Sequence, residues 1–444
     1  MQEEDGAAAP GGASAPVSAL SQPALEGRLS AVSSPSAGFI ADDAHAVPTV
    51  SETPLGALGV HLPVGDVPAA AVPAMRRLEQ RFGRAKSPRD LLSRPPRNAH
   101  GRWGHTFAAI DLGTNNCRLL VARPYRTSFR VVDAYSRTVR LGEGLTASGR
   151  LSDEAMTRTL DALKICAQKI ERRGVTQFRA VATAACRSAA NGREFIRRAE
   201  AETGLRFEVI TPEEEARLAV ESCASLLDRD CEHILVFDIG GGSTELVWLD
   251  RRVTVKPGEP IPMRAWTSLP HGVVTLTERF GTGDAPGEDA REIFKAMVTA
   301  VRESAQRFEL PEDVRRSIAQ GRAHMVGNSG TVTTIASVLL GLPRYDRARV
   351  DGAWIDLAAA ANLGRELSAR PPAVRAAHPC VGPERADLLL PGAALLQAIQ
   401  SIWPCDRLRV ADRGLREGVL LSLMARADRN ARKRRNEYAG NPTL

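Results

Sequence analysis

The sequence predicts an α/β fold built from two related halves, and three observations carry this prediction. From residue 103 onward, short strand-like runs alternate with longer helix-like runs, which is typical of a parallel or mixed sheet covered by helices. Residues 235–248 read as a strand, a tight turn of three consecutive glycines and a second strand. Residues 109–121 repeat that stretch without gaps and match Asp111 to Asp238, which indicates two halves that each carry such a hairpin.

The 444 residues allow two or three domains, and composition divides the chain into four segments. Residues 1–102 are first rich in Ala, Pro, Gly and Ser and then, after Met75, rich in arginine, so we expect a disordered extension. Met75 is also an alternative start of translation. We expect the first domain at 103–227, the second at 228–425 and a basic tail at 426–444.

The net charge of +7 lies mainly at the ends of the chain. By count, residues 1–75 carry −7, residues 76–102 carry +7, residues 103–425 carry +3 and residues 426–444 carry +4. An excess confined to flanking segments is typical of solvated ends rather than of a surface that reads bases. We therefore expect no specific nucleic-acid partner, while weak association with polyanions stays open.

The cysteine pattern and the hydropathy of the chain indicate in which cellular compartment we expect the protein. The seven cysteines are scattered and never form a CxxC pair, which argues against a metal–thiolate site and for a reducing compartment, here the cytoplasm. The first five residues are acidic, so we expect no secretory signal, and no apolar run is long enough to span a membrane. The scattered histidines show no metal-binding spacing, and we interpret His271 and His324 as structural or exposed. A homodimer is left open.

The elements of the first half follow its hairpin in order. We expect a strand over 128–136, a helix over 152–172 with Ser152 as N-cap, a strand over 179–183, a helix over 191–203 and a strand over 207–210. The next helix opens at Thr211 with Pro212 in its first turn and Glu214 in the capping-box position.

The second half begins with the glycine hairpin. We expect a turn-rich segment over 261–289, a helix over 288–308, a strand, Gly/Ser turn and helix over 323–332, helices over 352–369 and 384–401, a strand over 408–412 and a closing helix from 414.

The glycine hairpin has the residues of a phosphate and metal site. Consecutive exposed N–H groups in a glycine turn form a concavity that binds anions. Asp238 and Glu245 bracket this turn, and two carboxylates beside a phosphate cradle suit a divalent cation such as Mg²⁺. The alternative is a glycine hairpin with two solvated acids. The second copy of the hairpin favours two turns that face one cleft and grip phosphates from both sides.

Two further residues are candidates because of their position. Arg187 follows a strand and precedes a helix, where open α/β sheets bind ligands and where a guanidinium suits a phosphate; the alternative is a solvated arginine. The helix cap is enough to explain why Glu213 and Glu214 stand at their positions, but it does not explain Glu215. Glu215 could orient or deprotonate a water in the cleft, and the alternative is a glutamate that only favours the helix dipole.

Six motifs together resemble one family. They are Ile110–Asn116, Arg187 with Asn191, Glu214–Leu218, Asp238–Glu245, Gly327–Thr331 and Leu415–Gly418. Their order and spacing, from about Thr106 to Arg426, resemble the exopolyphosphatase / guanosine pentaphosphate phosphohydrolase family. The resemblance implies an actin-like ATPase fold of two ribonuclease-H-like domains with the site between them. It also implies the short form, without C-terminal helical domains.

The resemblance implies a role for each matching residue. Glu215 corresponds to the catalytic glutamate that activates water, and Asp238 and Glu245 correspond to Mg²⁺-associated carboxylates. The implied phosphate contacts are Asp111, Gly113, Thr114, Asn115, Asn116, Arg187, Gly240, Gly241, Gly242, Ser243, Thr244, Asn328, Ser329, Gly330 and Thr331. One departure is Asn116, which stands where the family usually has a serine, so the contact of this position stays open.

The residues and the resemblance together predict a Mg²⁺-dependent hydrolase that releases terminal phosphate from inorganic polyphosphate. Removal of the 5′ γ-phosphate from guanosine pentaphosphate uses the same phosphorus chemistry and is the alternative substrate reaction. An alarmone- or phosphate-sensing protein and an ATP-dependent sugar kinase are alternatives of other classes. Glu215, Asp238 and Glu245 argue against the sensor, and the remaining motifs argue against the kinase.

Overall fold

The computed structural model describes residues 101–439 apart from 127, 229, 254–260 and 283–288. The expected disordered extension therefore lies outside the described residues, except for its last two. These two begin a short 3₁₀ helix, η1 (Gly101–Gly104). Within the described ranges no helix is long and apolar enough to cross a membrane.

The first half forms a five-stranded mixed sheet with the order β3-β2-β1-β4-β5. β1 is antiparallel to β2 and parallel to β4, so the hairpin occupies one side of the sheet and the parallel strands the other. The strands are β1 (Phe107–Leu112), β2 (Asn116–Tyr125), β3 (Ser128–Thr138), β4 (Gln177–Ala182) and β5 (Phe207–Val209). The helices are α3 (Leu145–Ser148), α4 (Asp153–Arg172), α5 (Ala184–Ser188), α6 (Gly192–Thr203), α7 (Pro212–Cys223) and the 3₁₀ turn η2 (Ala224–Leu226).

The second half repeats this topology. Its sheet has the order β10-β11-β9-β6-β7-β8, so that β6, β7 and β8 occupy the places of β1, β2 and β3. The strands are β6 (His233–Ile239), β7 (Thr244–Asp250), β8 (Met263–Leu269), β9 (Ala323–Asn328), β10 (Trp354–Asp356) and β11 (Arg407–Ala411). This duplicated order confirms the predicted α/β fold of two ribonuclease-H-like lobes.

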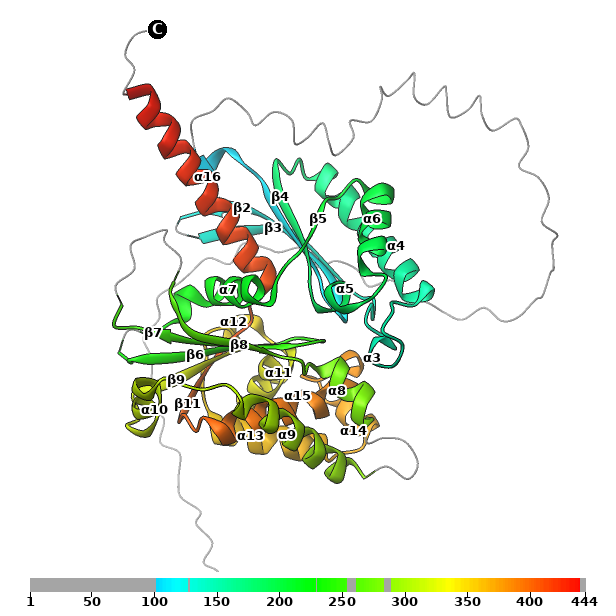
Figure 1. Cartoon of the computed structure of the whole chain (residues 1–444), viewed down its shortest axis with the longest axis vertical. Coiled ribbons are helices and arrows are strands. Elements are labelled where there is room, and N and C mark those ends of the chain that lie inside the picture. The colour runs from blue at the N-terminus through cyan, green and yellow to red at the C-terminus, as the bar shows by residue number, and fades with distance from the viewer. Residues whose placement is uncertain (1–100, 127, 229, 254–260, 283–288, 440–444) are drawn as a thin grey trace, which may run out of the picture. The chain divides into compact units, whose positions relative to one another are not determined.

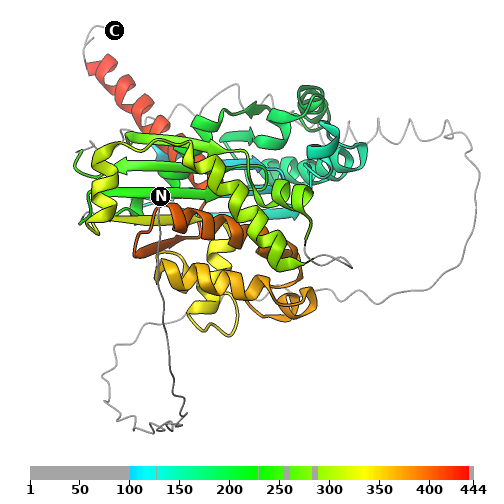
Figure 2. The ribbon, with the colours of Figure 1, turned by 60° about the horizontal axis from the view of Figure 1, so that its bottom comes forward.

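Helices cover both sheets, and α7 and α16 (Leu415–Ala439) lie between the lobes (Figures 1 and 2). The helices of the second half are α8 (Val273–Phe280), α9 (Ala290–Gln306), α10 (Glu312–Ala319), α11 (Gly330–Leu339), α12 (Arg347–Val350), α13 (Leu357–Ser368), α14 (Pro372–Ala377), α15 (Pro383–Ile402) and α16 (Leu415–Ala439).

The hydrophobic clusters show how these layers pack. One face of the first sheet packs on α4 and α6, and its other face packs on α16. The second sheet packs on α7 with one face and on α9, α13 and α15 with the other. α7 and α16 cross so closely that a Cβ on Gly418 would lie 2.1 Å from the carbonyl oxygen of Leu218.

Two expectations about local structure are wrong. The segment expected to be turn-rich contains a strand, β8, and a helix, α8, because β8 completes the second sheet by pairing with β7. The helix expected from residue 352 begins at Leu357, where Asp356 caps it by accepting from the Ala359 N–H at 2.6 Å, and the residues before it form β10. The closing helix α16 runs to Ala439 and so includes most of the segment expected to be a basic tail.

Candidate functional site

A cavity of about 690 Å³ lies where the two glycine hairpins meet. It is lined by both hairpin turns, by the N-terminal ends of α7 and α11, and by the segment that joins β11 to α16. Besides Glu215, the sequence predicted seventeen site residues. Fifteen of these line the cavity, as Glu215 does. The exceptions are Arg187 and Thr244, whose side chains are engaged elsewhere.

The two hairpin turns have the same internal hydrogen bond. The Gly113 N–H donates to the carbonyl of Asn116 at 3.0 Å, and the Gly240 N–H donates to the carbonyl of Ser243 at 2.9 Å. The first turn contacts the second, because a Cβ on Gly241 would lie 3.0 Å from Cβ of Thr114. The sequence repeat therefore corresponds to two equivalent turns that face each other.

Several backbone N–H groups at these turns have no acceptor within the described part of the chain. The amides of Gly241 and Gly242 donate no hydrogen bond there, although both residues line the cavity. The N-terminus of α11 reaches the same cavity at Ser329 and Gly330. Turn amides and a helix N-terminus are groups that bind phosphate oxygens.

Two predicted phosphate contacts use their hydroxyl groups inside the protein. Thr244 is fully buried and donates from Oγ1 to the carbonyl of His271 at 2.7 Å. Ser329 accepts at Oγ from the N–H of Val332 at 2.9 Å and so caps α11. The Asn116 side chain accepts from the Thr138 hydroxyl at 3.1 Å.

Four of the six carboxyl groups that line this cavity come from the two hairpins and from α7. Asp238 pairs with Glu245 across β6 and β7, and Asp111 occupies the equivalent place in the first lobe. Asp238 accepts from the Asn328 side-chain amide at 3.1 Å, while Glu245 accepts from the hydroxyls of Ser243 and Ser268 at 2.7 and 2.9 Å. Glu215, in the first turns of α7, completes the set.

Burial raises the pKa of all four carboxyl groups, and repulsion among them raises the pKa of Glu215, Asp238 and Glu245 further. Burial and then Glu245 raise the pKa of Glu215 to about 8, against the opposing effect of Arg187. Burial, with Glu215 and Asp111 next, raises the pKa of Asp238 to about 8. Burial and Asp238 raise the pKa of Glu245 to about 7, and burial also raises that of Asp111. Such a set of oxygen donors fits a divalent cation, because a cation would stabilise the ionised forms.

Arg187 lies in the short helix α5, directly after β4. Its Nη1 donates to Oε2 of Glu215 at 3.1 Å and to the carbonyl of Ile210 at 2.9 Å. The arginine therefore fixes the position of the Glu215 carboxylate and favours its charged form. The neighbouring Glu214 accepts from Arg179 and Arg217, while the Thr211 hydroxyl caps the helix at 3.2 Å.

The sequence reasoning missed a group of cavity residues on four segments of the chain. They are Arg118, Arg137, Glu384, Arg385, Asp412, Arg413 and Arg416. Two signals pointed to them: Arg118 takes the place of Glu245 in the repeat, and Arg416 belongs to the last of the six motifs.

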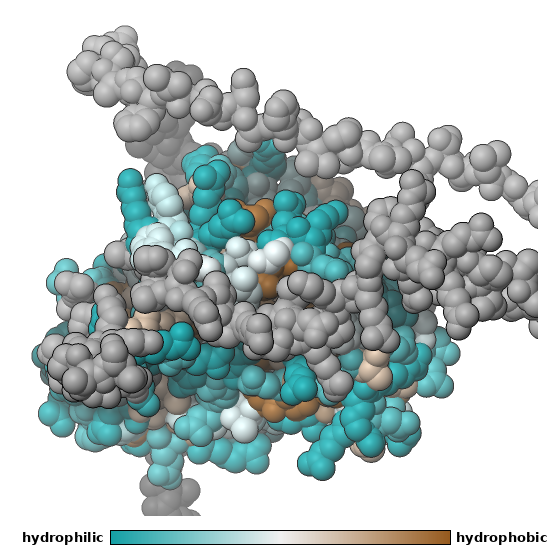
Figure 3. All heavy atoms as spheres, turned by 90° about the horizontal axis from the view of Figure 1, so that it is seen from above, coloured by the Kyte–Doolittle hydropathy of each residue, from teal (hydrophilic) through white to brown (hydrophobic). Residues whose placement is uncertain are grey.

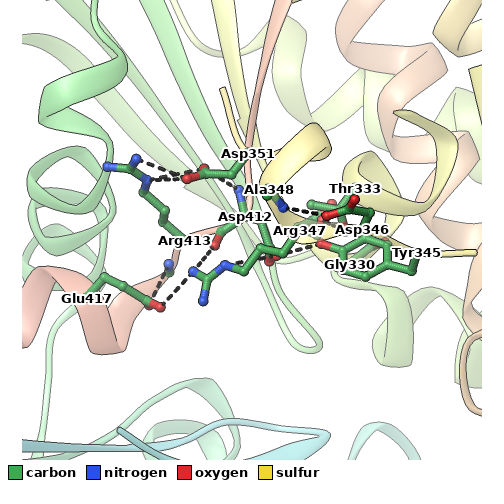
Figure 4. Close-up of polar contacts among 12 residues, drawn as sticks. Gly330, Thr333, Tyr345, Asp346, Arg347, Ala348, Asp351, Asp412, Arg413 and Glu417 are labelled. Atoms are coloured by element: carbon green, nitrogen blue, oxygen red, sulfur yellow. Dashed lines mark hydrogen bonds and ion pairs between the residues drawn. The ribbon is translucent and has the colours of Figure 1, made fainter. Parts of the chain in front are cut away.

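A polar network fixes the segment that joins β11 to α16 (Figure 4). Tyr345 donates from its hydroxyl to Asp412 at 2.5 Å, and Arg347 contacts both Asp412 and Glu417. Arg413 pairs with Asp351 at 3.0 Å and donates to the Ser225 hydroxyl. It therefore connects the segment before α16 to the turn η2 that follows α7. This network holds the start of α16 against the cavity.

A second group of possible metal ligands lies outside the cavity. His233, Asp250 and Asp313 each offer a ligand atom within 4.8 Å of the others. The guanidinium of Arg252 bonds to both aspartates, at 2.7 and 2.9 Å, and lies 3.3 Å from Nε2 of His233. The Arg252 guanidinium is thus already paired with both aspartates. The four carboxyl groups of the hairpins and α7 therefore fit a metal ion better.

The fold and site define a two-lobed α/β protein whose two glycine turns and a set of four carboxyl groups meet in one cavity between its lobes. A sequence profile of the Ppx/GppA phosphatase family matches residues 120–427, and the chain belongs to this family. A crystal structure of the Aquifex aeolicus family member is 31% identical, covers 72% of this chain and 97% of its own, and superposes with a TM-score of 0.58.

Two further solved structures are similar over the same share of the chain. An exopolyphosphatase-like protein is 30% identical, covers 72% of this chain and 99% of its own, and has a TM-score of 0.63. An exopolyphosphatase from Cytophaga hutchinsonii is 24% identical, covers 72% and 97%, and has a TM-score of 0.61, so it supports the fold alone.

Proposed function

We propose that this family phosphatase is an exopolyphosphatase, which hydrolyses the terminal phosphoanhydride bond of inorganic polyphosphate. The observation that carries the proposal is the meeting of two turns with free amides and four carboxyl groups in one cavity. Free amides suit the phosphoryl oxygens, and a carboxylate held beside them suits the attacking water. The seven cysteines are all free, which fits the cytoplasm as the compartment.

Glu215 is the residue to which we assign water activation. Arg187 holds its carboxylate in place, and the raised pKa brings it close to neutral pH, where a general base is most effective. In its ionised form Glu215 accepts a proton from water as the water oxygen attacks the terminal phosphorus. The amides of Gly241 and Gly242 then face the oxygens of the phosphoryl group that leaves the chain.

Asp238 and Glu245 are the carboxylates that would hold Mg²⁺, with Asp111 beside them. The ion would neutralise part of the phosphate charge and offset the repulsion among the carboxylates. Ser243, Ser268 and Asn328 orient these carboxylates through the hydrogen bonds described above.

Glu215→Gln tests the assignment, because it replaces the base with an amide of the same shape. We expect phosphate release from long-chain polyphosphate to fall by about 10²–10⁴-fold, the usual contribution of a positioned general base. Glu213→Gln is the matched control, since Glu213 is exposed on the same first turn of α7. Full activity of Glu215→Gln, with Glu213→Gln also active, would contradict the role of Glu215.

Guanosine pentaphosphate is the second substrate to measure. Release of its 5′ γ-phosphate needs the same water, the same carboxylate and the same turns. Phosphate release from both substrates, measured side by side with the same preparation, decides between them. A larger kcat/KM for guanosine pentaphosphate would identify it, in place of polyphosphate, as the preferred substrate. The proposed chemistry at phosphorus would stay the same.

A further inference from the structure

The far end of α16 is a cationic part of the first lobe. The helix begins at the cavity and continues for 25 residues, about 37 Å at 1.5 Å per residue. Its last described side chains include Arg432 and Arg434, which are exposed and have no ion pair among the described residues. The face onto which α16 extends is mostly hydrophilic where described residues are visible (Figure 3).

The other cationic segment of the chain arrives at the same place. η1 packs on this part of α16, because the Arg102 backbone N–H and side chain bond to Asp428 at 2.8 and 2.6 Å. Two residues beyond Trp103, burial and then Arg434 lower the pKa of His105. In the sequence, residues 76–102 carry +7 and residues 426–444 carry +4.

The tip of the β2–β3 hairpin adds charge beside η1. Arg123 lies directly opposite Arg130 in the sheet, and like charges in this arrangement repel. Arg126 lies over the ring of Tyr125 at 5.3 Å from its centroid. Phe107 pairs with Ala122, so the chain before β1 runs along the end of β2 that carries these residues.

Two aromatic rings are exposed within this cationic region. Trp103 is 60% exposed and Tyr125 is 51% exposed, which are the two largest values among the exposed large hydrophobic residues of the described chain. We call Trp103, Tyr125, Arg126, Arg130, Arg432 and Arg434 the end surface. Tyr125, Arg126 and Arg130 lie at the tip of the β2–β3 hairpin, at the other end of β2 from the first glycine turn, and Trp103 belongs to η1, which packs on the same end of α16 as Arg432 and Arg434.

We propose that the end surface binds single-stranded nucleic acid without sequence preference. Surfaces of this kind combine cationic groups for the phosphates with exposed aromatic rings on which bases stack. Charge alone would fit any polyanion, but polyphosphate has no bases and would make no use of Trp103 and Tyr125. RNA and DNA share the chemistry that this surface recognises, and the proposal is independent of what the cavity hydrolyses.

Fluorescence anisotropy with a labelled single-stranded 20-mer, as RNA and as DNA, tests the proposal on the full chain. We expect the charge reversal Arg432→Glu with Arg434→Glu to weaken binding by about tenfold or more. It should also lower the slope of log affinity against log salt by about 1.4, since each phosphate contact on a single strand contributes about 0.7. Arg193→Glu with Arg197→Glu, two exposed arginines on α6, is the matched control and should bind like the wild type.

Substitutions of Trp103 test the contribution of base stacking separately from that of charge. Trp103→Ala should weaken binding by about tenfold without changing the salt slope, because stacking of one base contributes about 1–3 kcal/mol. Trp103→Tyr keeps a ring and should retain most of the affinity. Phosphate release from triphosphate should be unchanged in all these variants, which shows that the cavity is intact.

Two outcomes would overturn the proposal. If the reversal at Arg432 and Arg434 binds like the Arg193 and Arg197 control, the end surface is not a binding site. If Trp103→Ala loses nothing while the reversal weakens binding, and polyphosphate of equal charge competes as well as the oligonucleotide, the surface recognises polyanions by charge alone.

Discussion

Gly242→Ala would place a methyl group between the two lobes at the cavity. The Cβ would lie 2.7 Å from Oγ1 of Thr114 and 2.9 Å from Cβ of Ala184, and both of these residues belong to the first lobe. Gly242 does not have a left-handed backbone conformation, so the only effect of the substitution is the space that the methyl group needs.

The distances set the size of the effect. Ordinary contact begins near 3.4 Å, so the Thr114 hydroxyl has to move by about 0.7 Å or the lobes have to separate by a similar amount. If the lobes stay closed, overpacking should lower the free energy of unfolding by about 1–3 kcal/mol. If they separate, a displacement near 1 Å of the second turn should lower phosphate release by about 10²-fold.

Urea unfolding and phosphate release, measured on the same preparation, show which of the two effects occurs. Gly104→Ala is the control for the substitution itself, because a Cβ there meets nothing within 4 Å. Thr114→Ala in the Gly242→Ala background should recover more stability than the two single changes predict when added, since it removes the atom that clashes. Wild-type stability together with wild-type activity of Gly242→Ala would show that the two turns do not approach each other this closely in solution.

Arg187→Lys should lower phosphate release strongly, because lysine cannot bond to Glu215 and the Ile210 carbonyl in the same geometry; the measurement is kcat for polyphosphate. Asp238→Asn and Glu245→Gln should each raise the Mg²⁺ concentration for half-maximal activity, and an unchanged requirement in both would remove them as ligands. Because the pKa values of Glu215, Asp238 and Glu245 are raised on folding, the protein without metal binds more protons when folded, so its melting temperature should fall as the pH rises toward about 8. The increase in melting temperature that Mg²⁺ causes should accordingly be larger at pH 8 than at pH 6, and an equal increase at both would contradict a site made of these carboxylates. Glu278→Gln should weaken the contact between α8 and α3, where the Glu278 carboxylate accepts from the N–H groups of Gly144 and Thr146 at 2.6 and 3.1 Å, and should raise the KM for polyphosphate if this contact helps to close the cavity.

The hairpins and the helix caps could be predicted because they depend on residues close in sequence. The Gly113 and Gly240 turns are closed by hydrogen bonds over three residues, and the Thr211 cap acts over the same span. β8 could not be predicted in this way. Five of its seven residues are half-buried, so no buried/exposed alternation marks it as a strand, and its strand conformation depends on pairing with β7.

The missing part of the site comes from contacts that join distant parts of the chain. Arg416 reaches the cavity because α16 returns to the first lobe, where Gly418 allows its close crossing with α7. The motif that contains both residues was visible in the sequence, but no spacing rule relates it to Asp111, more than 300 residues earlier. Thr244 illustrates the opposite case: it lies in the predicted turn, yet strand pairing turns its hydroxyl toward the carbonyl of His271 and away from the cavity.

The charge balance of the cavity links cation binding to substrate binding. The pKa values of Glu215, Asp238 and Glu245 are each raised by at least one other carboxyl group of the set, and of the four groups only Glu215 has a bonded guanidinium in the described structure. A polyphosphate end brought to these ionised carboxylates alone would be repelled, whereas a divalent cation held by Asp238 and Glu245 would attract both the carboxylates and the phosphate. A cation without the phosphate would in turn leave the amides of Gly241 and Gly242 without acceptors. We therefore infer that metal and substrate bind cooperatively, so that each lowers the concentration of the other needed to fill the site.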